Sequence, residues 1–368
     1  MTAARWDVAV VGAGPAGAAA ALAAVRAGAR VLLLDRADFP RDKPCGDGIA
    51  AEAVDVLAGL GVDGVTDGYR PVTNLRLVAP GGAQVSRPLP RVAHTIPRRV
   101  FDARLVAAAV AAGAELRRHT VRGLDDELLG RAAVVVGADG AASVVRRGLG
   151  HPANPPGHLA IAIRGYTPSD NREQLIVTTE ARWPAYAWSF PIGDGTANVG
   201  YGEVLRGAAL SRPYLLERLA ALLPGGEPAN LRAHHLPLST RRPPPARGRF
   251  LLAGDALSLI NPFTGEGIFY AVLSGALAGA AAVAGPERAA ALYTAALRRR
   301  LGRHLRHSGL ATRLTQRPRV VDAAVRAAHR NQSVFTRMVD LGLGDGVFDL
   351  RTIGRIGAEL ARRRSTAP

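Results

Sequence analysis

A glycine-rich turn near the N-terminus has the residue types and the spacing to bind the phosphates of a dinucleotide. In the stretch VAVVGAGPAGAAAA, Gly12, Gly14 and Gly17 follow an apolar run, and a helical pattern begins at Ala16. The first glycine permits a tight turn, the second lets the backbone approach a pyrophosphate, and the third allows close packing of the helix. Phosphate would then face the free N–H groups of the helix N-terminus. Asp35 ends the next apolar run, where it can accept a hydrogen bond from a ribose hydroxyl, so we predict a dinucleotide site.

A second distinctive segment is the loop 41–48, RDKPCGDG, which contains the only lysine of the chain, Lys43, and its only cysteine, Cys45. A thiol can deliver a proton and an ammonium can hold an anion, but the pKa of each depends on its surroundings. Two unique residues two positions apart are either a chance pairing or the mark of a site. A single cysteine cannot form an intramolecular disulfide, which favours a reducing, cytoplasmic compartment.

Three aromatic side chains alternate in the stretch YAWSFP, which has the pattern of a β-strand. Successive side chains of a strand point to opposite faces, so Tyr186, Trp188 and Phe190 are expected on one face. Three rings on one face make a flat apolar wall, suited to a polyprenyl chain or another apolar substrate. An ordinary sheet core has the same pattern, and the residues alone do not separate the two interpretations.

Two later segments carry a resemblance to a known class of flavoproteins. The stretches VVVGADGAASVVRR (134–147) and RFLLAGDALSLINPFTGEGI (249–268) each contain a buried strand, an acidic turn and a helix. With the glycine turn, they resemble the FAD-dependent oxidoreductases that have the hydroxylase-type flavin fold. The resemblance implies that Asp139 belongs to a second fingerprint, that Asp255 binds the ribityl chain and that Arg99 lies near the flavin. Taken singly, each acidic turn could instead be a helix cap.

Three motifs narrow the resemblance to one family. The segments FPRDKPCGDG, YAWSFPIGDGTANVGYG and NPFTGEGI look like the geranylgeranyl reductase family, which includes menaquinone-side-chain reductases. That family carries Tyr-x-Trp-x-Phe-Pro followed by Gly-x-Gly, and here Pro191 is followed by eight residues and then by Gly200 and Gly202. The resemblance covers about residues 5–290. It implies that the three aromatic residues, Pro191, Gly200 and Gly202 contact the substrate.

The same resemblance places the loop 41–48 beside the isoalloxazine ring. Cys45 would then be a flavin neighbour and, with Tyr186 or a water, a candidate proton donor, so that Cys45 and Tyr186 are the candidate catalytic residues. Lys43 would hold the reduced flavin anion or be an ordinary surface residue. The remaining cofactor-binding residues implied by the resemblance are Arg36, Gly46, Gly48, Val121, Gly265, Gly267 and Ile268.

The function implied by the resemblance is that of an FAD-dependent reductase that saturates carbon–carbon double bonds of an isoprenoid or another apolar substrate. The flavin carries the hydride, and the protein supplies binding, orientation and exclusion of water. The sequence has no second dinucleotide motif, so NADPH or another reductant is expected to bind transiently. One alternative is a flavin-dependent monooxygenase or halogenase of natural-product biosynthesis on the same fold. Another is a flavoprotein that binds membranes or polyanions without turnover.

The expected elements give a mixed α/β fold, in which a Rossmann-like FAD-binding domain is interleaved with an antiparallel β-sheet substrate domain. We predict residues 1–70, 98–150 and 248–300 in the FAD-binding domain and residues 71–97 and 151–247 in the β-rich substrate domain. Residues 301–368 are expected to form an arginine-rich helical segment. The stretch 119–140 leaves little room for the β-meander that relatives have after the strand near Val121, which favours a specialised substrate.

The charge of the chain suggests further partners. The formal net charge of the 368 residues is +17, and residues 298–330 contain ten arginines against one acid, Asp322. Such a surface attracts nucleic acid, anionic lipid or acidic substrates, or is simply a solvated face. Nucleic acid is not expected, because binding motifs are absent and aromatic residues make up only 5% of the chain. A cytoplasmic protein is expected, with or without a peripheral membrane contact through the basic segment.

The remaining motifs give little information about function. His234 and His235 have no cysteine or carboxylate at ligand spacing, so we predict no metal site. The apolar run 268–285 is rich in alanine and glycine, and we expect it to form a buried helix, not a membrane span. The N-terminus lacks the basic region of a signal peptide.

Overall fold

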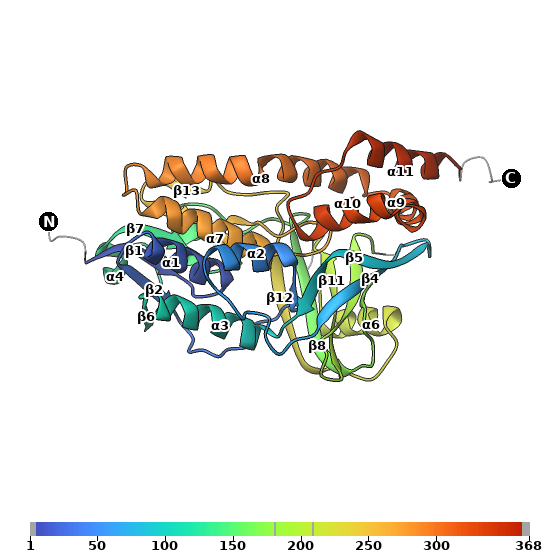
Figure 1. The fold of residues 1–368 in the computed structure, drawn as a ribbon, viewed down its shortest axis with the longest axis horizontal. Helices are drawn as coiled ribbons and strands as arrows, with labels where there is room; N and C mark the ends of the chain where they lie inside the picture. The colour runs from blue at the N-terminus through green and yellow to red at the C-terminus, as the bar shows by residue number, and fades with distance from the viewer. Residues whose placement is uncertain (1–4, 180–181, 208–209, 363–368) are drawn as a thin grey trace.

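Two β-sheets form the centre of the molecule, and helices cover them (Figure 1). The computed structural model describes residues 5–179, 182–207 and 210–362, so residues 1–4 and 363–368 of the predicted terminal segments lie outside the described residues. A six-stranded sheet lies towards the N-terminus, an eight-stranded sheet lies beside it, and a long C-terminal helix runs from one to the other. The prediction of a mixed α/β fold is confirmed.

The six-stranded sheet has the order β13–β14–β7–β1–β2–β6. Its strands are β1 (Trp6–Val11), β2 (Val31–Asp35), β6 (Glu115–Arg118), β7 (Ala132–Gly137), β13 (Ala246–Arg247) and β14 (Phe250–Leu252). Neighbouring strands run parallel except β13 with β14. Strands β1, β2 and β7 are nearly continuous apolar runs, as is usual for parallel strands that are covered on both faces. Because parallel strands end at one edge, the turns after β1, β2 and β7 lie together.

Two helices pack closely over this sheet, α1 (Pro15–Arg26) and α7 (Ile268–Ala282). Glycine makes their approach possible: a Cβ atom at Gly275 would lie 2.0 Å from the Ala16 carbonyl oxygen, and one at Gly279 would lie 2.1 Å from the Ala20 oxygen. Helix α7 is almost entirely buried, as expected for the apolar run. The remaining helices of this half are α2 (Ala51–Gly59), α3 (Arg98–Ala111), α4 (Glu127–Gly130), α5 (Val144–Gly148) and the 3₁₀ turn η1 (Gly254–Leu257).

The connection between β6 and β7 is short. Residues 119–131, all of them described, contain α4 and no strand. The β-meander is therefore missing at this place, in agreement with the short spacing in the sequence.

The eight-stranded sheet has the order β12–β8–β11–β10–β9–β4–β5–β3. Its strands are β3 (Gly48–Ile49), β4 (Pro71–Val78), β5 (Gln84–Thr95), β8 (Leu159–Pro168), β9 (Gln174–Thr178), β10 (Ala185–Pro191), β11 (Thr196–Val204) and β12 (Ala229–Pro237). Neighbours are antiparallel except β4 with β9. Helix α6 (Arg212–Leu222) packs on the outer face, where Leu215 and Leu219 join a core that includes Ala187 and Tyr201. The opposite, inner face of this sheet lines the cavity described below.

Up to residue 362, where the described part of the chain ends, four helices follow α7: α8 (Ala289–Leu314), α9 (Pro318–Arg330), α10 (Gln332–Leu343) and α11 (Leu350–Arg362). Helices α9 and α10 pack against β5, where Val325 and Phe335 form a buried cluster with Leu75 and Val85 of the sheet. The C-terminal segment therefore covers one end of the eight-stranded sheet. Within the described residues, no helix is long and apolar enough to cross a membrane.

Both sheets are built from segments that alternate along the chain. Two short strands join the sheet opposite to the one expected from their predicted domain: β3 pairs with β5, and β13 pairs with β14. The domain boundaries themselves remain a prediction.

Candidate active site

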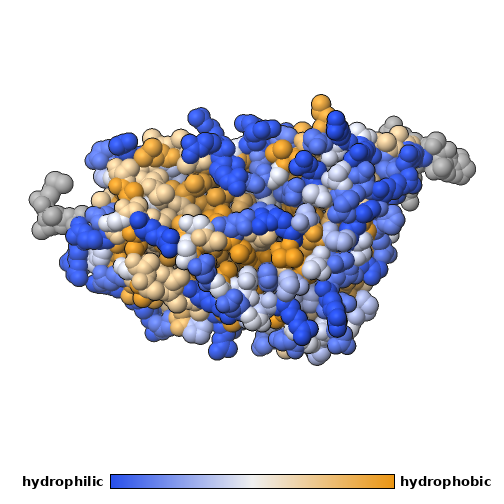
Figure 2. All heavy atoms as spheres, in the orientation of Figure 1, coloured by the Kyte–Doolittle hydropathy of each residue, from blue (hydrophilic) through white to orange (hydrophobic). Residues whose placement is uncertain are grey.

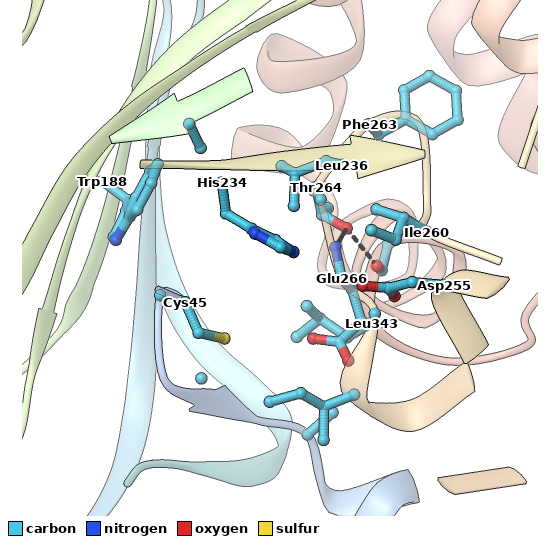
Figure 3. A pocket seen from close by; sticks show the side chains of 18 of the residues that line it. Cys45, Trp188, His234, Leu236, Asp255, Ile260, Phe263, Thr264, Glu266 and Leu343 are labelled. Atoms are coloured by element: carbon cyan, nitrogen blue, oxygen red, sulfur yellow. Dashed lines mark hydrogen bonds between the residues drawn. The ribbon is translucent and has the colours of Figure 1, made fainter. Parts of the chain in front are cut away.

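One large cavity, of about 980 Å³, lies between the two sheets and the C-terminal helices. At one end it reaches the glycine turn and Asp35, and at the other it reaches Val321, Val325 and Met338 of the last helices. Between these ends, the side chains of Cys45, Trp188, His234, Asp255 and Glu266 point into the same space from different elements (Figure 3). The cavity is thus a polar crevice joined to an apolar chamber.

The crevice has the shape that a pyrophosphate needs. Gly12 has φ of +94°, and a Cβ atom there would lie 2.5 Å from the Ala138 carbonyl oxygen, so glycine is required for the turn. A Cβ at Gly17 would lie 1.7 Å from the Gly12 oxygen, because α1 packs tightly on β1. At Gly14 the nearest atom to such a Cβ is Arg41 Nη2 at 3.5 Å, and no side chain caps the α1 N-terminus. The free N–H groups of α1 are open to an anion.

Asp35 is held in position by the backbone. Its Oδ2 accepts a hydrogen bond from Ala13 N at 2.8 Å, and its Oδ1 accepts one from Ala37 N at 2.9 Å. A carboxylate has about four lone-pair sites, so Asp35 can still accept from a ribose hydroxyl. The predicted residues Ala16, Arg36 and Val121 also line this end of the cavity, and the donor set therefore fits FAD.

The structure brings Arg98, not its neighbour Arg99, to the cavity, and the position of Arg99 near the flavin remains a prediction. Arg99 is exposed and is not among the residues that line the cavity, whereas Arg98 is 5% exposed and lines it. The guanidinium of Arg98 donates to both oxygens of Asp102, at 2.6 and 2.8 Å, and Arg41 approaches the same carboxylate at 3.2 Å. A hypothetical Cβ at Gly14 lies 4.0 Å from Arg98 Nη2. Two guanidinium groups, those of Arg98 and Arg41, therefore face the glycine turn.

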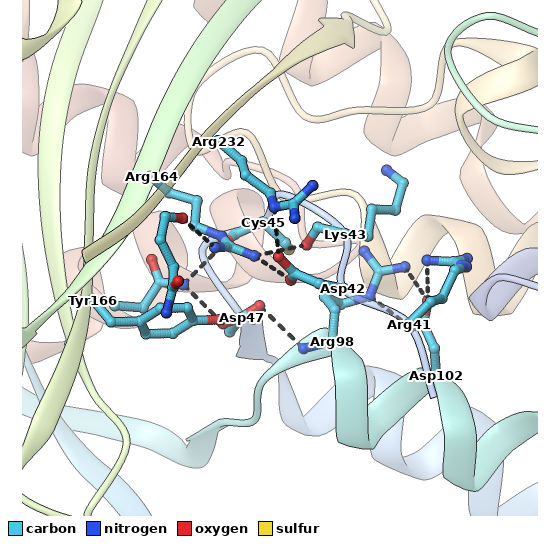
Figure 4. Close-up of polar contacts among 12 residues, drawn as sticks. Arg41, Asp42, Lys43, Cys45, Asp47, Arg98, Asp102, Arg164, Tyr166 and Arg232 are labelled. Carbon is cyan, nitrogen blue, oxygen red and sulfur yellow. Dashed lines mark hydrogen bonds and ion pairs between the residues drawn. The ribbon is translucent and has the colours of Figure 1, made fainter. Parts of the chain in front are cut away.

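The loop 41–48 is fastened to the eight-stranded sheet by charged and polar contacts (Figure 4). Asp42 forms ion pairs with Arg164 of β8 and with Arg232 of β12, the latter at 3.1 Å. Asp47 has φ of +61° and is fully buried, and it accepts hydrogen bonds from the Tyr166 hydroxyl at 2.6 Å and from Asn198 Nδ2 at 2.8 Å. Burial raises the pKa of Asp47 to about 6, despite these hydrogen bonds.

Asn198 links this loop to the aromatic strand. Its Nδ2 donates to the Cys45 carbonyl oxygen at 2.8 Å, and its Oδ1 accepts from Trp188 Nε1 at 2.9 Å. A Cβ atom at Gly46 would lie 3.3 Å from Trp188 Nε1 and 3.5 Å from the Phe190 ring. The close approach that glycine allows at Gly46 is therefore an approach to the aromatic wall, and its predicted contact with the flavin remains a prediction, as does that of Gly48.

Lys43 belongs to the cavity. Its Nζ donates to His234 Nε2 at 3.2 Å and lies 3.9 Å from Asp255 Oδ2. Burial lowers the pKa of Lys43, and burial together with the Lys43 charge lowers the pKa of His234 to about 4. His234 is therefore neutral near pH 7, and its Nε2 can accept a hydrogen bond from Lys43. The thiol of Cys45 faces the same space, and burial raises its pKa, so the sulfur is protonated.

The aromatic side chains of β10 form the predicted wall. Tyr186, Trp188 and Phe190 all line the cavity, with centroids 6.0 Å apart for the first pair of rings and 6.5 Å for the second. Ala185 and Ala187, on the opposite face of β10, belong to the core beneath α6. The expectation that these three rings share one face is confirmed.

The other three predicted substrate residues lie behind this wall. Pro191, Gly200 and Gly202 are not among the residues that line the cavity, and their contact with the substrate remains a prediction. A Cβ atom at Gly200 would lie 2.2 Å from the Trp188 ring, because β11 runs directly beside β10. Gly200 therefore makes room for the indole.

The two acidic turns differ in what they do. Asp139 accepts hydrogen bonds from Ser143 Oγ at 2.5 Å and from Val144 N at 2.6 Å, so it caps α5 while it lines the cavity. Asp255 lines the cavity from η1 and pairs with Lys43. The loop before α7 contributes the predicted residues Gly265 and Gly267 to the lining, and the predicted residue Ile268, the first of α7, also lines the cavity.

Sequence reasoning missed another residue of this loop, Glu266. Its Oε1 accepts a hydrogen bond from Phe269 N at 2.8 Å, and burial raises its pKa to about 7. Beside it, the Tyr186 hydroxyl donates to the Thr264 carbonyl oxygen, and the burial of Tyr186 raises its pKa. Glu266 occurs within NPFTGEGI, but nothing in the sequence told its carboxyl from an ordinary helix cap.

His234 was also missed. The alternation of β12 puts Arg232, His234 and Leu236 on the inner face, and all three line the cavity. The alternation in LRAHHLP shows which residues share a face of β12, but not which of the two faces lies towards the cavity. That depends on the strand with which β12 pairs.

The apolar chamber owes one of its sides to the C-terminal helices. Its lining on this side includes Leu310, Leu314, Val320, Val321, Met338 and Ile353. Leu310 and Leu314 are each 56% exposed and Ile353 is 49% exposed, although all three line the cavity, so the chamber opens to solvent between α8 and α11. Elsewhere on the molecule, in the view of Figure 2, apolar atoms gather over the middle of the surface, bordered by hydrophilic side chains.

Comparisons with known proteins agree with this geometry. A profile of the FAD binding domain matches residues 5–162. The chain is 35% identical over 310 residues to the menaquinone reductase of Mycolicibacterium smegmatis, a match that covers 74% of this chain and 75% of that protein. It is also 35% identical over 310 residues to digeranylgeranylglycerophospholipid reductase 1 of Methanopyrus kandleri, which covers 76% of this chain and 80% of the relative.

Solved structures share the fold. A geranylgeranyl bacteriochlorophyll reductase-like protein from Thermoplasma acidophilum superposes with a TM-score of 0.79 at 21% identity, over 98% of each chain. A variant of a flavin-dependent brominase superposes with a TM-score of 0.70 at 16% identity, over 98% of this chain and 100% of that one. Reductases and halogenases therefore share this architecture, and the fold alone does not choose between them.

Proposed function

The chain belongs to the geranylgeranyl reductase family of FAD-dependent oxidoreductases, and from this premise we propose that it reduces carbon–carbon double bonds of a polyprenyl-type apolar substrate. The observation that carries the proposal is the single cavity that joins the FAD crevice to the apolar chamber. A long apolar chain in this chamber would lie against Trp188 and Phe190 and against the inner faces of α8, α9 and α10. The named activities of the relatives, on a menaquinone and on a digeranylgeranyl lipid, agree with such an occupant.

The residues that would hold FAD are those of the crevice. The N-terminus of α1 and the Gly12–Gly14 turn would take the pyrophosphate, Asp35 a ribose hydroxyl and Asp255 the ribityl chain. When bound and reduced, FAD supplies a hydride. NADPH or another reductant would deliver the electrons by transient binding.

The protein supplies orientation and exclusion of water. Trp188 is 5% exposed. Its indole packs directly on Gly200 and donates a hydrogen bond to Asn198, and these contacts hold the ring in the wall of the chamber. An apolar chamber also disfavours water at the reacting carbon atoms, which strengthens electrostatic interactions there. A halogenase would need a lysine beside its substrate, and Lys43, the only lysine, is bound to His234 and Asp255 instead.

We include a peripheral membrane contact in this proposal. The mouth between α8 and α11 exposes Leu310, Leu314 and Ile353, and Leu350 nearby is 86% exposed. Exposed arginines lie on the same two helices and in the turn after α8: Arg306, Arg313, Arg317, Arg351 and Arg355. Exposed apolar side chains on helices that also carry exposed cations favour the surface of an anionic bilayer. A cytoplasmic enzyme of this kind could draw a lipid substrate from the membrane directly into the chamber.

The test is an anaerobic half-reaction. The purified flavoprotein is photoreduced without oxygen, a geranylgeranyl lipid or a menaquinone is added, and the flavin spectrum and the product mass are followed. Reoxidation of the flavin with a gain of two hydrogens by the product is the expected result. Flavin that stays reduced until oxygen is admitted, with a product that then gains an oxygen atom, would mean monooxygenase chemistry.

A matched pair of variants tests the chamber. Val321→Trp fills part of the chamber, and Val283→Trp places the same side chain on the surface, where Val283 is 38% exposed. We expect the first variant to lose activity on long polyprenyl substrates and the second to keep it. Equal activity of both variants on a long substrate would argue against binding in this chamber.

A further inference from the structure

Glu266 occupies the point where the FAD crevice meets the apolar chamber. It lies in the loop between η1 and α7, and it lines the cavity together with Cys45, Tyr186 and Leu343. Figure 3 shows its carboxyl group in the space that the Cys45 thiol also faces. A substrate carbon that lies against the aromatic wall at this junction would be close to both side chains.

The other carboxylates that line the cavity have partners of their own. Asp35 and Asp139 accept backbone N–H groups, Asp42 pairs with Arg164, Asp47 accepts from Tyr166 and Asn198, and Asp255 pairs with Lys43. Glu266 accepts from Phe269 N through Oε1, and no cationic side chain of the described residues forms an ion pair with it. A buried carboxyl group without a cation favours its neutral, proton-bearing form.

The remaining titratable groups at the junction are poorer donors near neutral pH. Burial raises the pKa of Cys45 and of Tyr186, and the Tyr186 hydroxyl already donates to Thr264. The pKa of His234 is lowered to about 4, so its ring carries no spare proton, and Lys43 is paired with Asp255. Burial raises the pKa of Glu266 to about 7, which makes it the strongest acid here that is still protonated near pH 7.

We propose that Glu266 is the catalytic acid that protonates the substrate double bond, an inference that rests on the proposed reductase function. One alkene carbon receives the hydride that reduced FAD supplies, and the other receives the proton of Glu266. Two C–H bonds form as the π bond is lost, FAD is left oxidised by two electrons, and Glu266 is left as a carboxylate that regains a proton from solvent.

Charged groups on several elements face Glu266 and set its titration. Burial has the largest effect and raises its pKa, and backbone hydrogen bonds from Phe269 and Ile268 lower it. Glu52 on α2 raises the pKa further, and Arg98 on α3 lowers it. The other titratable neighbours at the junction are Lys43, Cys45, Tyr186, His234 and Asp255. As the pH rises through about 7, Glu266 loses its proton, so turnover should fall.

The test uses Glu266→Gln in the FAD-loaded enzyme. An amide can still accept from Phe269 N, so the helix cap is kept while the acidic proton is removed. Flavin reoxidation by substrate in a single anaerobic turnover should slow by about 100-fold, with FAD affinity and thermal stability unchanged. Glu52→Gln is the matched control: the loss of its charge should shift the pH profile of turnover to lower pH, without abolishing turnover.

An infrared titration gives a readout that does not depend on turnover. A protonated-carboxyl band that disappears as the pH rises through neutrality and is missing in Glu266→Gln is the expected result. A Glu266 that is ionised well below neutral pH, or a variant that reoxidises within threefold of the wild-type rate, would overturn the proposal. If the wild-type enzyme reduces no alkene, the proposed function fails and the donor role falls with it, whatever the infrared titration shows.

Discussion

The contact of α1 with α7 decides whether the FAD crevice forms, and Gly275→Ala tests this directly. The new Cβ would lie 2.0 Å from the Ala16 carbonyl oxygen and 3.0 Å from Ala16 Cα, both of them backbone atoms that cannot rotate away. To restore an ordinary contact, the helices must separate by roughly 1.4 Å. Alanine gains about 1 kcal/mol in helix propensity, and overpacking of a core costs about 1–3 kcal/mol. With a backbone clash at the upper end of that range, we expect the free energy of unfolding to fall by about 2 kcal/mol.

The same shift should reach the cofactor. Ala16 lies in the first turn of α1, whose N–H groups face the pyrophosphate in our assignment. A displacement of this turn should weaken FAD binding by about tenfold, equivalent to about 1.4 kcal/mol. Denaturant unfolding of the apoprotein and titration with FAD measure the two effects separately.

Gly357→Ala is the matched control. Gly357 also lies inside a helix, α11, but a Cβ atom there would meet nothing within 4 Å. This variant should therefore be stabilised by about 0.5–1 kcal/mol and bind FAD normally. If Gly275→Ala were as stable as the wild type and kept its FAD affinity, the close approach of α1 and α7 would not be what shapes the crevice.

Three further predictions test the remaining parts of the site. Arg98→Met should weaken FAD binding at least about tenfold, because the Arg98 guanidinium faces the glycine turn. Arg99→Met should leave FAD binding unchanged, because Arg99 is exposed to solvent. Equal dissociation constants of the two variants for FAD would mean that Arg98 is not the arginine that contacts the cofactor. Because burial raises the pKa of Asp47 to about 6, the folded protein binds this proton more tightly than the unfolded chain. The contribution of Asp47 to stability should therefore be largest below pH about 4 and be lost as the pH rises to about 6; Asp47→Asn should remove this contribution from the profile in denaturant melts. The double variant Leu310→Ser, Leu314→Ser should lose about 2 kcal/mol of binding free energy to anionic vesicles, because each leucine is 56% exposed at the mouth of the chamber. In a sedimentation assay this is a loss of about 30-fold in affinity. Unchanged sedimentation would mean that the mouth does not contact the membrane.

The sequence was most informative where local chemistry determines local geometry. The glycine turn, the acid that ends β2 and the alternation of β10 are all set by neighbours within a few residues, and the structure places each of them at the cavity. Arg99 shows the limit of such reasoning, because its neighbour Arg98 is the arginine that lines the cavity. Helix α3 begins at Arg98, directly after Pro97, and successive helical residues are rotated by about 100°. A difference of one residue at a helix start therefore decides which of two arginines faces the site.

The residues that sequence reasoning missed depend on distant partners. His234 gains its place because β12 pairs with β8, and Lys43 reaches it from a loop 191 residues earlier in the chain. The chamber needs α9 and α10 to pack on β5, again across more than 200 residues. The composition of the basic segment suggested only a charged surface, because an amphipathic helix does not indicate which sheet its apolar face will cover.

The charges around the junction explain why the unique lysine belongs in this loop. Three cations, Arg41, Lys43 and Arg98, are opposed there by two buried or half-buried carboxylates, Asp102 and Asp255. Cys45 and His234 are neutral near pH 7 and Glu266 is mostly protonated below about 7, so in that range these three groups add little negative charge beside the guanidinium groups of Arg41 and Arg98. Positive charge beside the crevice favours a reduced flavin that carries negative charge. Reduction of the double bond also requires that the nearby acid still carries its proton. Positive charge beside the crevice and a carboxyl of raised pKa are therefore parts of the same requirement, and a change that removes the Lys43 charge should weaken the hold on reduced flavin more than on oxidised flavin.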